Sequence, residues 1–511
     1  MHPADDRSHR SLGVRFASRP QWVSISCLTL AVLAPLRFEF RAVVLSQDEG
    51  ILLAYPVQIL HGAVPNLSFE SVYGAVSLWT IASSFKIFGY SLASERGVAL
   101  IYWVILIGSM SVLVGRRRGT ILGTLSGLVT ILLLVSDVGL VAYAWIGAVA
   151  LGALGMVLLD SAEQSRRPVL LLMSGVCFGL SVAFRLDLVV AVTLVTALIA
   201  TRSRRRCWWF FSGILIGLIP VAINAVQAGL SSVIRGQFLQ PVFATEPGRR
   251  LPISGLTHPA QIVLVLSVVA VAGIIATGVS SLRSDQSCLL LAVGLFDLGL
   301  LPEMFQRFDV IHVAFVACVV LPSALLVPAL RPAKWAAGPV VAGGLIVAIC
   351  PFVLSPYFAT VAQSLGVRST PSFLVNNHGR STLVASRDDQ RHLSALLAAI
   401  DVRANPGQRV FVGPDDLRRT NYNDTYLYFL LPQLTPGSFY LEMEPGVANA
   451  PSSHLAHDLR TNDWLVLTSA YDHWFEPNAS SAFGSDTANR VILKDFHTVG
   501  QWGPWRLLFK N

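Results

Sequence analysis

Long apolar segments separated by short polar ones occupy the first two thirds of the chain. The stretches at residues 119–136 and 260–281 contain no charged residue, and both are close to the ~20 residues that a helix needs to cross a bilayer. Similar segments recur, which predicts a polytopic α-helical membrane protein. We predict eleven membrane spans, near residues 21–37, 96–115, 119–136, 138–159, 168–185, 187–201, 208–225, 260–281, 287–304, 310–330 and 335–354.

Clusters of basic residues between the apolar segments predict how the chain is oriented. Cytoplasmic loops carry an excess of arginine and lysine, so we place all five clusters in the cytoplasm. With eleven spans, the N-terminus is then cytoplasmic and the C-terminus lies outside, which we expect in a plasma (inner) membrane. No small-residue cleavage site follows the first apolar run, so we predict a retained first helix. The clusters are Arg116–Arg118, Arg166 with Arg167, Arg202–Arg206, Arg283, and Arg331 with Lys334.

One apolar segment, residues 72–90, does not fit this count. It contains Lys86 and Gly74, and counting it as a span places Asp48 on the same side of the membrane as the cytoplasmic Arg116–Arg118 cluster. We therefore predict a helix that lies along the outer surface of the membrane, paired with a shorter one at residues 50–61. The alternative is an ordinary span.

The chain becomes polar after Pro356, and helical and strand patterns alternate there. We expect residues 1–355 to form the membrane domain, with juxtamembrane helices at about 50–90, and residues 356–511 to form an extracytoplasmic α/β domain. A segment of this length buries a core of its own. Helices are predicted at residues 387–403 and 424–431, and strands at residues 409–412, 464–468 and 505–509.

Composition supports the membrane class and excludes others. Hydrophobic residues make up 53% of the chain and charged residues only 13%, against roughly a quarter charged in soluble domains. The net charge of +8 does not indicate nucleic acid, because the basic residues sit in short clusters between apolar runs. No CxxC or HExxH spacing occurs, so we predict no cofactor and no metal site, although an acidic pair facing phosphates can hold a divalent metal.

An acidic pair, Asp48 and Glu49, follows the first predicted span on the outer face. Carboxylates beside hydrocarbon are costly, so retained ones point to function. Such a pair suits general-base chemistry on an acceptor hydroxyl, or cation binding. The alternative is a helix N-terminus, where acidic residues are favoured by the helix dipole.

The stretch that begins with this pair contains Gln47-Asp48-Glu49-Gly50, Tyr55, Leu60, Gly62, Pro65, Tyr73-Gly74, Phe85–Leu92 and Glu95-Arg96. With these residues it resembles the first outer loop of the GT-C glycosyltransferases, which include protein O-mannosyltransferases and the lipid A aminoarabinose transferase. In that family an Asp-Glu pair ends the first helix, and two juxtamembrane helices precede the second span. The Pro-Pro pair of better-known members is replaced here by Val72-Tyr73-Gly74. The resemblance covers roughly residues 20–200 and supports the superfamily rather than a named activity.

The resemblance implies residues that meet the phosphate of a lipid carrier. Arg307 and His312 belong to a dense polar cluster after the ninth predicted span, together with Glu303, Gln306 and Asp309. Guanidinium groups bind phosphate bidentately, although a local Arg307–Asp309 ion pair is the alternative.

Other charged residues are candidates for the same site. Arg185 stands with Asp187 at another outer turn, where snorkelling to the membrane surface explains it equally well. Arg96 is a further phosphate candidate. Asp137, Asp187 and Asp309 are candidate supporting residues, and Asp137 is otherwise a helix cap.

The predicted function is a membrane glycosyltransferase that moves sugar from a polyprenyl-phosphate donor to an extracytoplasmic acceptor, with inversion. The acceptor is a cell-envelope glycan, lipid or protein. Asp48 is the expected base, supported by Glu49, and Asp48, Arg185 and Arg307 are expected to line one cavity beneath the C-terminal domain. The alternatives are a transporter or flippase of lipid-linked sugars, and a non-catalytic protein of envelope assembly.

Overall fold

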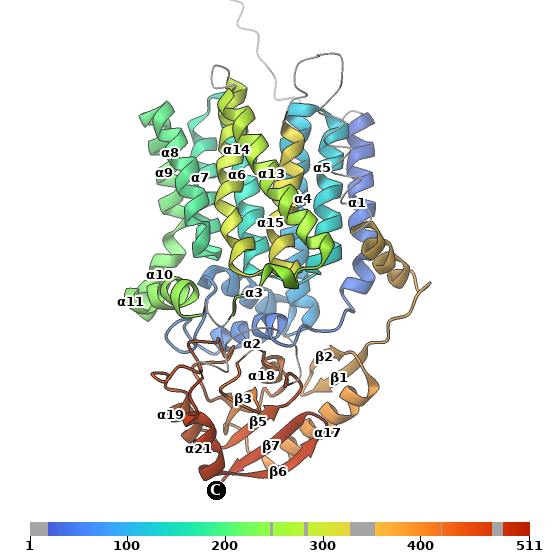
Figure 1. Cartoon of the computed structure of the whole chain (residues 1–511), viewed down its shortest axis with the longest axis vertical. Helices are drawn as coiled ribbons and strands as arrows, with labels where there is room; N and C mark the ends of the chain where they lie inside the picture. Colours follow the sequence, from blue (N-terminus) through green and yellow to red (C-terminus); the bar gives the residue numbers. More distant parts are fainter. Residues whose placement is uncertain (1–18, 246–248, 281–284, 328–352, 421, 473–483) are drawn as a thin grey trace, which may run out of the picture.

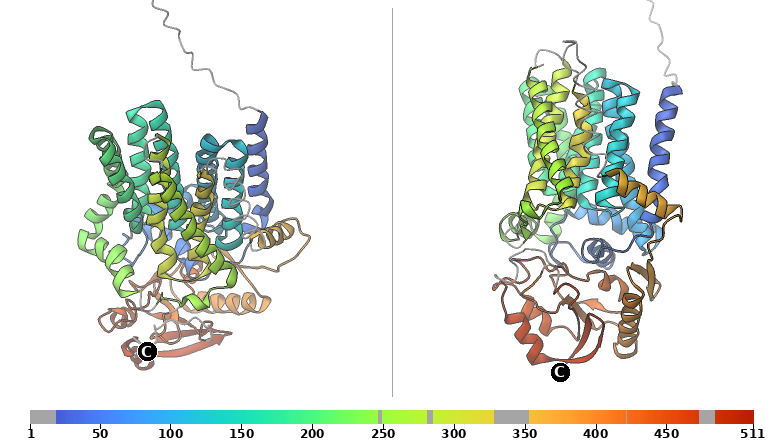
Figure 2. Two further views of the ribbon diagram at one scale, coloured as in Figure 1. Left: turned by 45° about the horizontal axis from the view of Figure 1, so that its top comes forward. Right: turned by 45° about the vertical axis from the view of Figure 1, so that its right-hand side comes forward.

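The chain folds into a helical bundle with a smaller α/β part stacked on one end (Figure 1). The computed structural model describes residues 19–511 except 246–248, 281–284, 328–352, 421 and 473–483. The N-terminal helix α1 belongs to the bundle, whereas the C-terminal sheet lies in the α/β part, beyond one end of the bundle (Figure 2).

Seven helices in the described residues are long and apolar enough to cross a membrane, which confirms a polytopic membrane protein. Three shorter helices, α7 (Pro168–Phe184), α8 (Val189–Arg202) and α15 (Val310–Ser323), occupy further predicted spans. The predicted span at residues 335–354 falls almost entirely outside the described residues. The longer spans contain α1 (Arg19–Glu39), α4 (Leu92–Arg118), α5 (Thr120–Leu133), α6 (Ala144–Ser165), α9 (Arg204–Gly217) with α10 (Ile219–Ala228), α13 (His258–Ser280) and α14 (Asp285–Gln306).

Two spans differ from the boundaries predicted for them. The predicted span at 138–159 begins only at Ala144, because α5 ends in the π-turn Leu134–Val138 and Gly139 then adopts a φ of 74°. Glycine takes this left-handed conformation without steric cost. The predicted span at 208–225 is interrupted between α9 and α10, where Pro220 stands in the first turn of α10 and cannot donate a helical hydrogen bond.

The juxtamembrane helices α2 (Asp48–Leu60) and α3 (Ala75–Phe88) lie between the bundle and the α/β part (Figure 1). At the start of α3, Gly74 N donates to the carbonyl of Phe184 at the end of α7. Near its other end, Ser84 Oγ donates to the carbonyl of Ser94 in the first turn of α4. Both contacts are at the same end of the bundle, so α3 runs across that end.

The C-terminal part contains a mixed five-stranded sheet in the order β4-β3-β5-β7-β6. Strand β3 is parallel to β4 and β5, whereas β7 is antiparallel to β5 and β6. All five residues of β5 are buried, as expected for a strand covered on both faces. The strands are β3 (Arg409–Pro414), β4 (Thr435–Pro436), β5 (Trp464–Thr468), β6 (Phe496–Trp502) and β7 (Trp505–Lys510).

Helices cover this sheet and a separate hairpin precedes it. The predicted helix at residues 387–403 is confirmed as α17 (Arg387–Arg403), and the one at 424–431 corresponds to α18 (Tyr426–Leu430). The sequence did not indicate the hairpin of β1 (Phe373–Asn377) with β2 (Arg380–Val384), nor the helices α19 (Leu455–Arg460) and α21 (Thr487–Asp495).

The predicted domain boundary at residues 355 and 356 falls within a helix, residues 353–364. This helix packs on α1: Tyr357 Oη donates to the carbonyl of Ala31 at 2.8 Å, and Ser364 Oγ donates to the carbonyl of Pro35 at 2.6 Å. These residues therefore pack with the membrane part, and the β-structure begins at Phe373.

Helix α2 joins the two parts. Its residues 49–57 are buried, and α18 packs against it so closely that a Cβ on Gly50 would lie 2.5 Å from the backbone nitrogen of Tyr426. Only glycine fits there. Gln47 Oε1 also accepts a hydrogen bond from the backbone N–H of Asn423 at 2.9 Å. The α/β part is thus seated directly on the helix that begins with Asp48.

Candidate functional site

A polar cavity of about 100 Å³ lies at the end of the bundle, beneath the α/β part. Its walls come from α2, the starts of α6 and α15, the ends of α7 and α14, and loops of the α/β part. The lining residues are Gln47, Asp48, Tyr73, Tyr143, Ala144, Trp145, Arg185, Arg249, Glu303, Arg307, Asp309, Ile311, His312, Phe315, Tyr422, Glu444 and Pro445. Asp48, Arg185 and Arg307, which are far apart in the sequence, therefore share one cavity.

Asp48 is a carboxylate of this cavity with few partners. In the described part of the chain its side chain makes one long hydrogen bond, accepted from Tyr143 Oη at 3.4 Å, and no ion pair within 4.0 Å. Burial raises the pKa of Asp48 above its ordinary value, an effect opposed by the charges of Arg249, His312 and Arg307. Such a carboxylate is available to accept a proton.

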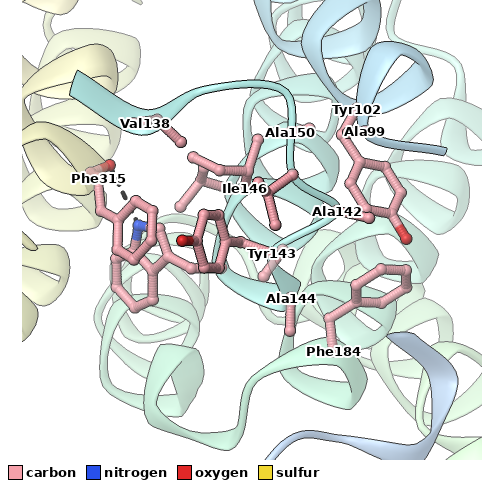
Figure 3. Close-up of a cluster of buried hydrophobic side chains, with 14 of the residues drawn as sticks. Ala99, Tyr102, Val138, Ala142, Tyr143, Ala144, Ile146, Ala150, Phe184 and Phe315 are labelled. Atoms are coloured by element: carbon pink, nitrogen blue, oxygen red, sulfur yellow. Dashed lines mark hydrogen bonds between the residues drawn. The ribbon is translucent and has the colours of Figure 1, made fainter. Parts of the chain in front are cut away.

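The loop at residues 139–143 positions Tyr143 beside Asp48. Leu140 N donates to Glu39 Oε2 at 3.0 Å, and Ala142 N donates to Glu95 Oε1 at 2.6 Å. Two buried carboxylates thus satisfy the backbone of a segment that forms no helix. Tyr143 also packs edge-on against Phe315, with ring centroids 5.1 Å apart (Figure 3). The cavity wall is therefore continuous with the hydrophobic core.

Three arginines face the cavity, each held by a carboxylate. Arg185 Nη2 lies 2.7 Å from Asp187 Oδ2 and 3.3 Å from Glu303 Oε2. Arg249 Nη1 lies 3.3 Å from Glu444 Oε1. These ion pairs hold the guanidinium groups at the cavity, where they can bind an anion.

Arg307 connects the bundle to the α/β part. Its Nε lies 2.7 Å from Asp309 Oδ2. This is the local ion pair that the sequence offered as the alternative to phosphate binding. Its other nitrogens donate to the carbonyl of Arg249 at 3.0 Å and to Tyr422 Oη at 3.1 Å. Arg307 therefore lines the cavity although it is paired with Asp309.

Asp309 caps α15 and holds His312 in the cavity wall. Its Oδ1 accepts from the backbone N–H of His312 at 2.8 Å, and the His312 Nδ1 lies 2.8 Å from the same oxygen. Burial opposes the charge on Asp309, but His312 and Arg307 outweigh it and hold the pKa of this carboxyl below its usual value. The imidazole Nε2 is left to face Glu303 Oε1 at 3.9 Å.

Glu49 and Arg96 lie outside the cavity, contrary to the sites expected for them. They form a buried bidentate pair, Arg96 Nε to Glu49 Oε1 at 2.7 Å and Arg96 Nη2 to Glu49 Oε2 at 2.9 Å. Arg96 Nη1 donates to the carbonyls of Glu39 and Ala42, both at 2.9 Å. The Arg96 guanidinium is thus bonded to the Glu49 carboxylate and to two backbone carbonyls, and it does not line the cavity. The pair instead fixes the turn that precedes α2.

Of the three acidic residues predicted to support the site, one lines the cavity and two do not. Asp309 lines the cavity, and Asp187 stands behind Arg185 without lining it. Asp137 lies in the π-turn at the end of α5, also outside the lining.

The lining residues that the sequence did not predict are Tyr143, Ala144, Trp145, Arg249, Ile311, Phe315, Tyr422, Glu444 and Pro445. Arg249 had a detectable signal, because the Arg249-Arg250 pair stands in a loop on the side of the membrane predicted to be poor in basic residues. Tyr422 and Glu444 belong to irregular loops of the α/β part, and their position depends on how that part docks.

Comparison with known proteins identifies the fold. No protein-family model matches the chain, and a search of curated proteins returns no match. Among solved structures, ArnT from Cupriavidus metallidurans bound to undecaprenyl phosphate is 12% identical, with 96% of this chain and 98% of that chain covered and a TM-score of 0.58. The same ArnT in the apo state is also 12% identical, with 96% of this chain and 97% of that chain covered and a TM-score of 0.59.

The archaeal oligosaccharyltransferase AglB from Archaeoglobus fulgidus, in complex with an inhibitory peptide and a dolichol-phosphate, is also similar. It is 9% identical, with 95% of this chain and 74% of that chain covered and a TM-score of 0.51. ArnT and AglB are both GT-C enzymes. The chain therefore shares the fold of ArnT and AglB, which is the fold that the resemblance to the GT-C glycosyltransferases predicted.

Proposed function

We propose that this chain is a membrane glycosyltransferase that takes sugar from a polyprenyl-phosphate donor. The observation that carries the proposal is one cavity in which the sparsely bonded carboxylate of Asp48 faces the guanidinium groups of Arg185, Arg249 and Arg307. A base and an anion-binding group are the two parts that displacement of a sugar from phosphate requires. Two structures of this fold contain polyprenyl phosphates, undecaprenyl phosphate in ArnT and a dolichol-phosphate in AglB.

The proposed reaction is a direct displacement at the anomeric carbon. The acceptor hydroxyl gives its proton to Asp48 while its oxygen forms a bond to the anomeric carbon. The bond from that carbon to the phosphate oxygen breaks, and the electron pair leaves with the polyprenyl phosphate. Arg307 and Arg185 stabilise the charge that develops on the phosphate, since preorganised donors act most strongly where charge appears. A single displacement inverts the configuration at the anomeric carbon.

The test is a transfer assay with the purified full-length chain. We expect release of polyprenyl phosphate and labelled product with at least one member of a panel of radiolabelled polyprenyl-phosphate sugars, given an envelope extract as acceptor. Transfer that requires intact Asp48 supports the enzyme. Transmembrane movement of the same donors in liposomes, without breakage of the sugar–phosphate bond, would instead identify a flippase.

Replacing Arg307 by alanine is expected to weaken donor binding. The substitution removes charge-assisted contacts to the phosphate worth about 1.5–3 kcal/mol, which corresponds to a roughly 10–150-fold rise in the Kd of the donor. Titration of the purified variant with a fluorescent polyprenyl-phosphate sugar measures this change. Arg250→Ala removes the same charge from an exposed neighbouring position outside the cavity lining and serves as the control. Equal affinities of Arg307→Ala and wild type would contradict the role of Arg307.

The α/β part and the cavity are proposed to face outside the cytoplasm. Arginine clusters lie at the opposite end of the bundle, at the ends of α4, α6 and α8, and such clusters face the cytoplasm. A reporter that is active only in the cytoplasm, fused after Asn511, should therefore remain silent, and a periplasmic reporter at the same position should be active. The opposite result would invert the topology and place Asp48 in the cytoplasm.

A further inference from the structure

A second polar hollow, of about 840 Å³, opens at the end of the bundle opposite the candidate site. Five arginines line this basic hollow: Arg117, Arg166, Arg202, Arg205 and Arg206. They come from three separate places, the end of α4, the turn after α6 and the turn between α8 and α9. Because the bundle separates this hollow from Asp48, the proposed transfer reaction makes no use of it.

The charges of the basic hollow are not balanced. Glu163 is the one carboxylate in its lining, and it pairs with Arg206 at 2.8 Å. Arg117 is also neutralised, by Asp160 of α6 beside the lining. In the part of the chain that the structure describes, the exposed side chains of Arg166 and Arg205 have no ion pair within 4.0 Å. Arg166 also adopts a φ of 55° at the C-cap of α6, where glycine or asparagine is the usual residue. Because these two arginines have no ion pair, an anion is the ligand that complements the charge of the basic hollow.

An apolar crevice continues from the basic hollow into the bundle. Its sides are Leu159 of α6, Leu198 and Ile199 of α8, and Leu289 and Ala292 of α14. It shares Glu163, Arg202, Arg206 and Cys288 with the hollow, so the two spaces are contiguous.

The surroundings indicate that the ligand is amphiphilic. Trp209 lines the hollow and Trp208 is 69% exposed beside it. Tryptophan is enriched at the level of lipid headgroups because its ring is apolar with a single polar N–H. A charged hollow, an adjoining apolar crevice and interfacial indoles together match a molecule with a phosphate head and a hydrocarbon tail.

We propose that the basic hollow binds an anionic phospholipid of the bilayer, with its phosphate among the arginines and an acyl chain along the apolar side chains at the mouth of the crevice. The charge selects anionic over zwitterionic lipid, and the crevice selects a lipid over free phosphate. Since each arginine near a membrane surface contributes about 1 kcal/mol toward anionic lipid, loss of two should weaken retention by roughly tenfold or more.

Native mass spectrometry of the purified full-length chain, incubated with equal amounts of phosphatidylglycerol and phosphatidylcholine, tests this proposal. We expect phosphatidylglycerol to be retained preferentially by wild type, and this preference to fall about tenfold in the double variant Arg166→Gln/Arg205→Gln. The control, Arg167→Gln/Arg204→Gln, removes the same charge from neighbouring positions that do not line the hollow, and should retain the preference. Thermal unfolding checks that both variants are folded.

Three outcomes would overturn the proposal. Equal losses in the test and control variants mean diffuse attraction to a basic surface. Displacement of phosphatidylglycerol by inorganic phosphate, with short-chain and long-chain lipids bound equally, means a site for soluble phosphate. Equal retention of phosphatidylcholine by wild type means that no anionic lipid is selected. None of these outcomes depends on glycosyl transfer, so the proposed function is tested separately.

Discussion

Replacing Asp48 by asparagine should reduce the rate of sugar transfer by roughly 10²–10⁴-fold, the range that a positioned general base contributes. Asparagine keeps the size of the side chain and can still accept the hydrogen bond from Tyr143 Oη, but it cannot take a proton. Because Asp48 is proposed to act on the acceptor, affinity for the donor should remain within about twofold. Single-turnover transfer and donor titration on the same preparation measure the two quantities.

The pH profile provides an independent check on Asp48. Burial raises the pKa of this carboxyl above its ordinary value, so kcat/KM should fall on the acid side at a pH above that of an exposed aspartate, as the base becomes protonated. Asp388→Asn is the matched control, because Asp388 is an exposed aspartate in the first turn of α17 that does not line the cavity. Wild-type transfer by Asp48→Asn would exclude Asp48 as the base, even with the fold intact.

Replacing Glu49 by alanine should destabilise the protein by about 3–5 kcal/mol, the cost of leaving a buried charge without its partner. The side chains of Arg96 and Glu49 are 2% and 0% exposed, so water cannot replace the lost carboxylate. Thermal unfolding in detergent, followed by loss of the monodisperse peak in size-exclusion chromatography, should show a clearly lowered Tm.

The double variant Glu49→Leu/Arg96→Met tests whether this loss comes from the unpaired charge. Replacing both partners of a buried pair by apolar residues is often close to neutral, so the double variant should recover much of the Tm. Recovery will be incomplete, because the carbonyls of Glu39 and Ala42 lose the hydrogen bonds from Arg96. A Glu49→Ala variant with wild-type Tm and no activity would instead assign Glu49 to the chemistry.

Elements with a strong local pattern could be predicted from the sequence. The uncharged run of α13 and the largely apolar run of β5 correspond to elements at the expected residues, because hydrophobic periodicity and run length depend on the chain alone. The sequence also predicted a helix at residues 72–90 along the membrane surface, from Lys86 and the basic cluster of residues 116–118, and in the structure α3 crosses one end of the bundle.

Features that depend on contacts between distant segments could not be predicted. The non-helical residues 139–143 look like the start of an apolar span, and only the carboxylates of Glu39 and Glu95 make their extended course favourable. Arg96 looked like a phosphate ligand because its partner Glu49 is 47 residues away and was itself a candidate for chemistry. No local pattern distinguishes a buried structural ion pair from a functional one.

The burial of α2 limits how the C-terminal part of this chain can be exchanged for that of another protein. Helix α2 begins with Asp48 and is held by the bundle on one side and by α18 on the other, with Gly50 in contact with the backbone at Tyr426. A chimera that exchanges only residues 373–511 for the tail of another enzyme would bring a different surface against this glycine. The smallest unit that can be exchanged is therefore discontinuous and includes α2 together with the tail. An exchange of tails will require both pieces to be taken from the same parent protein.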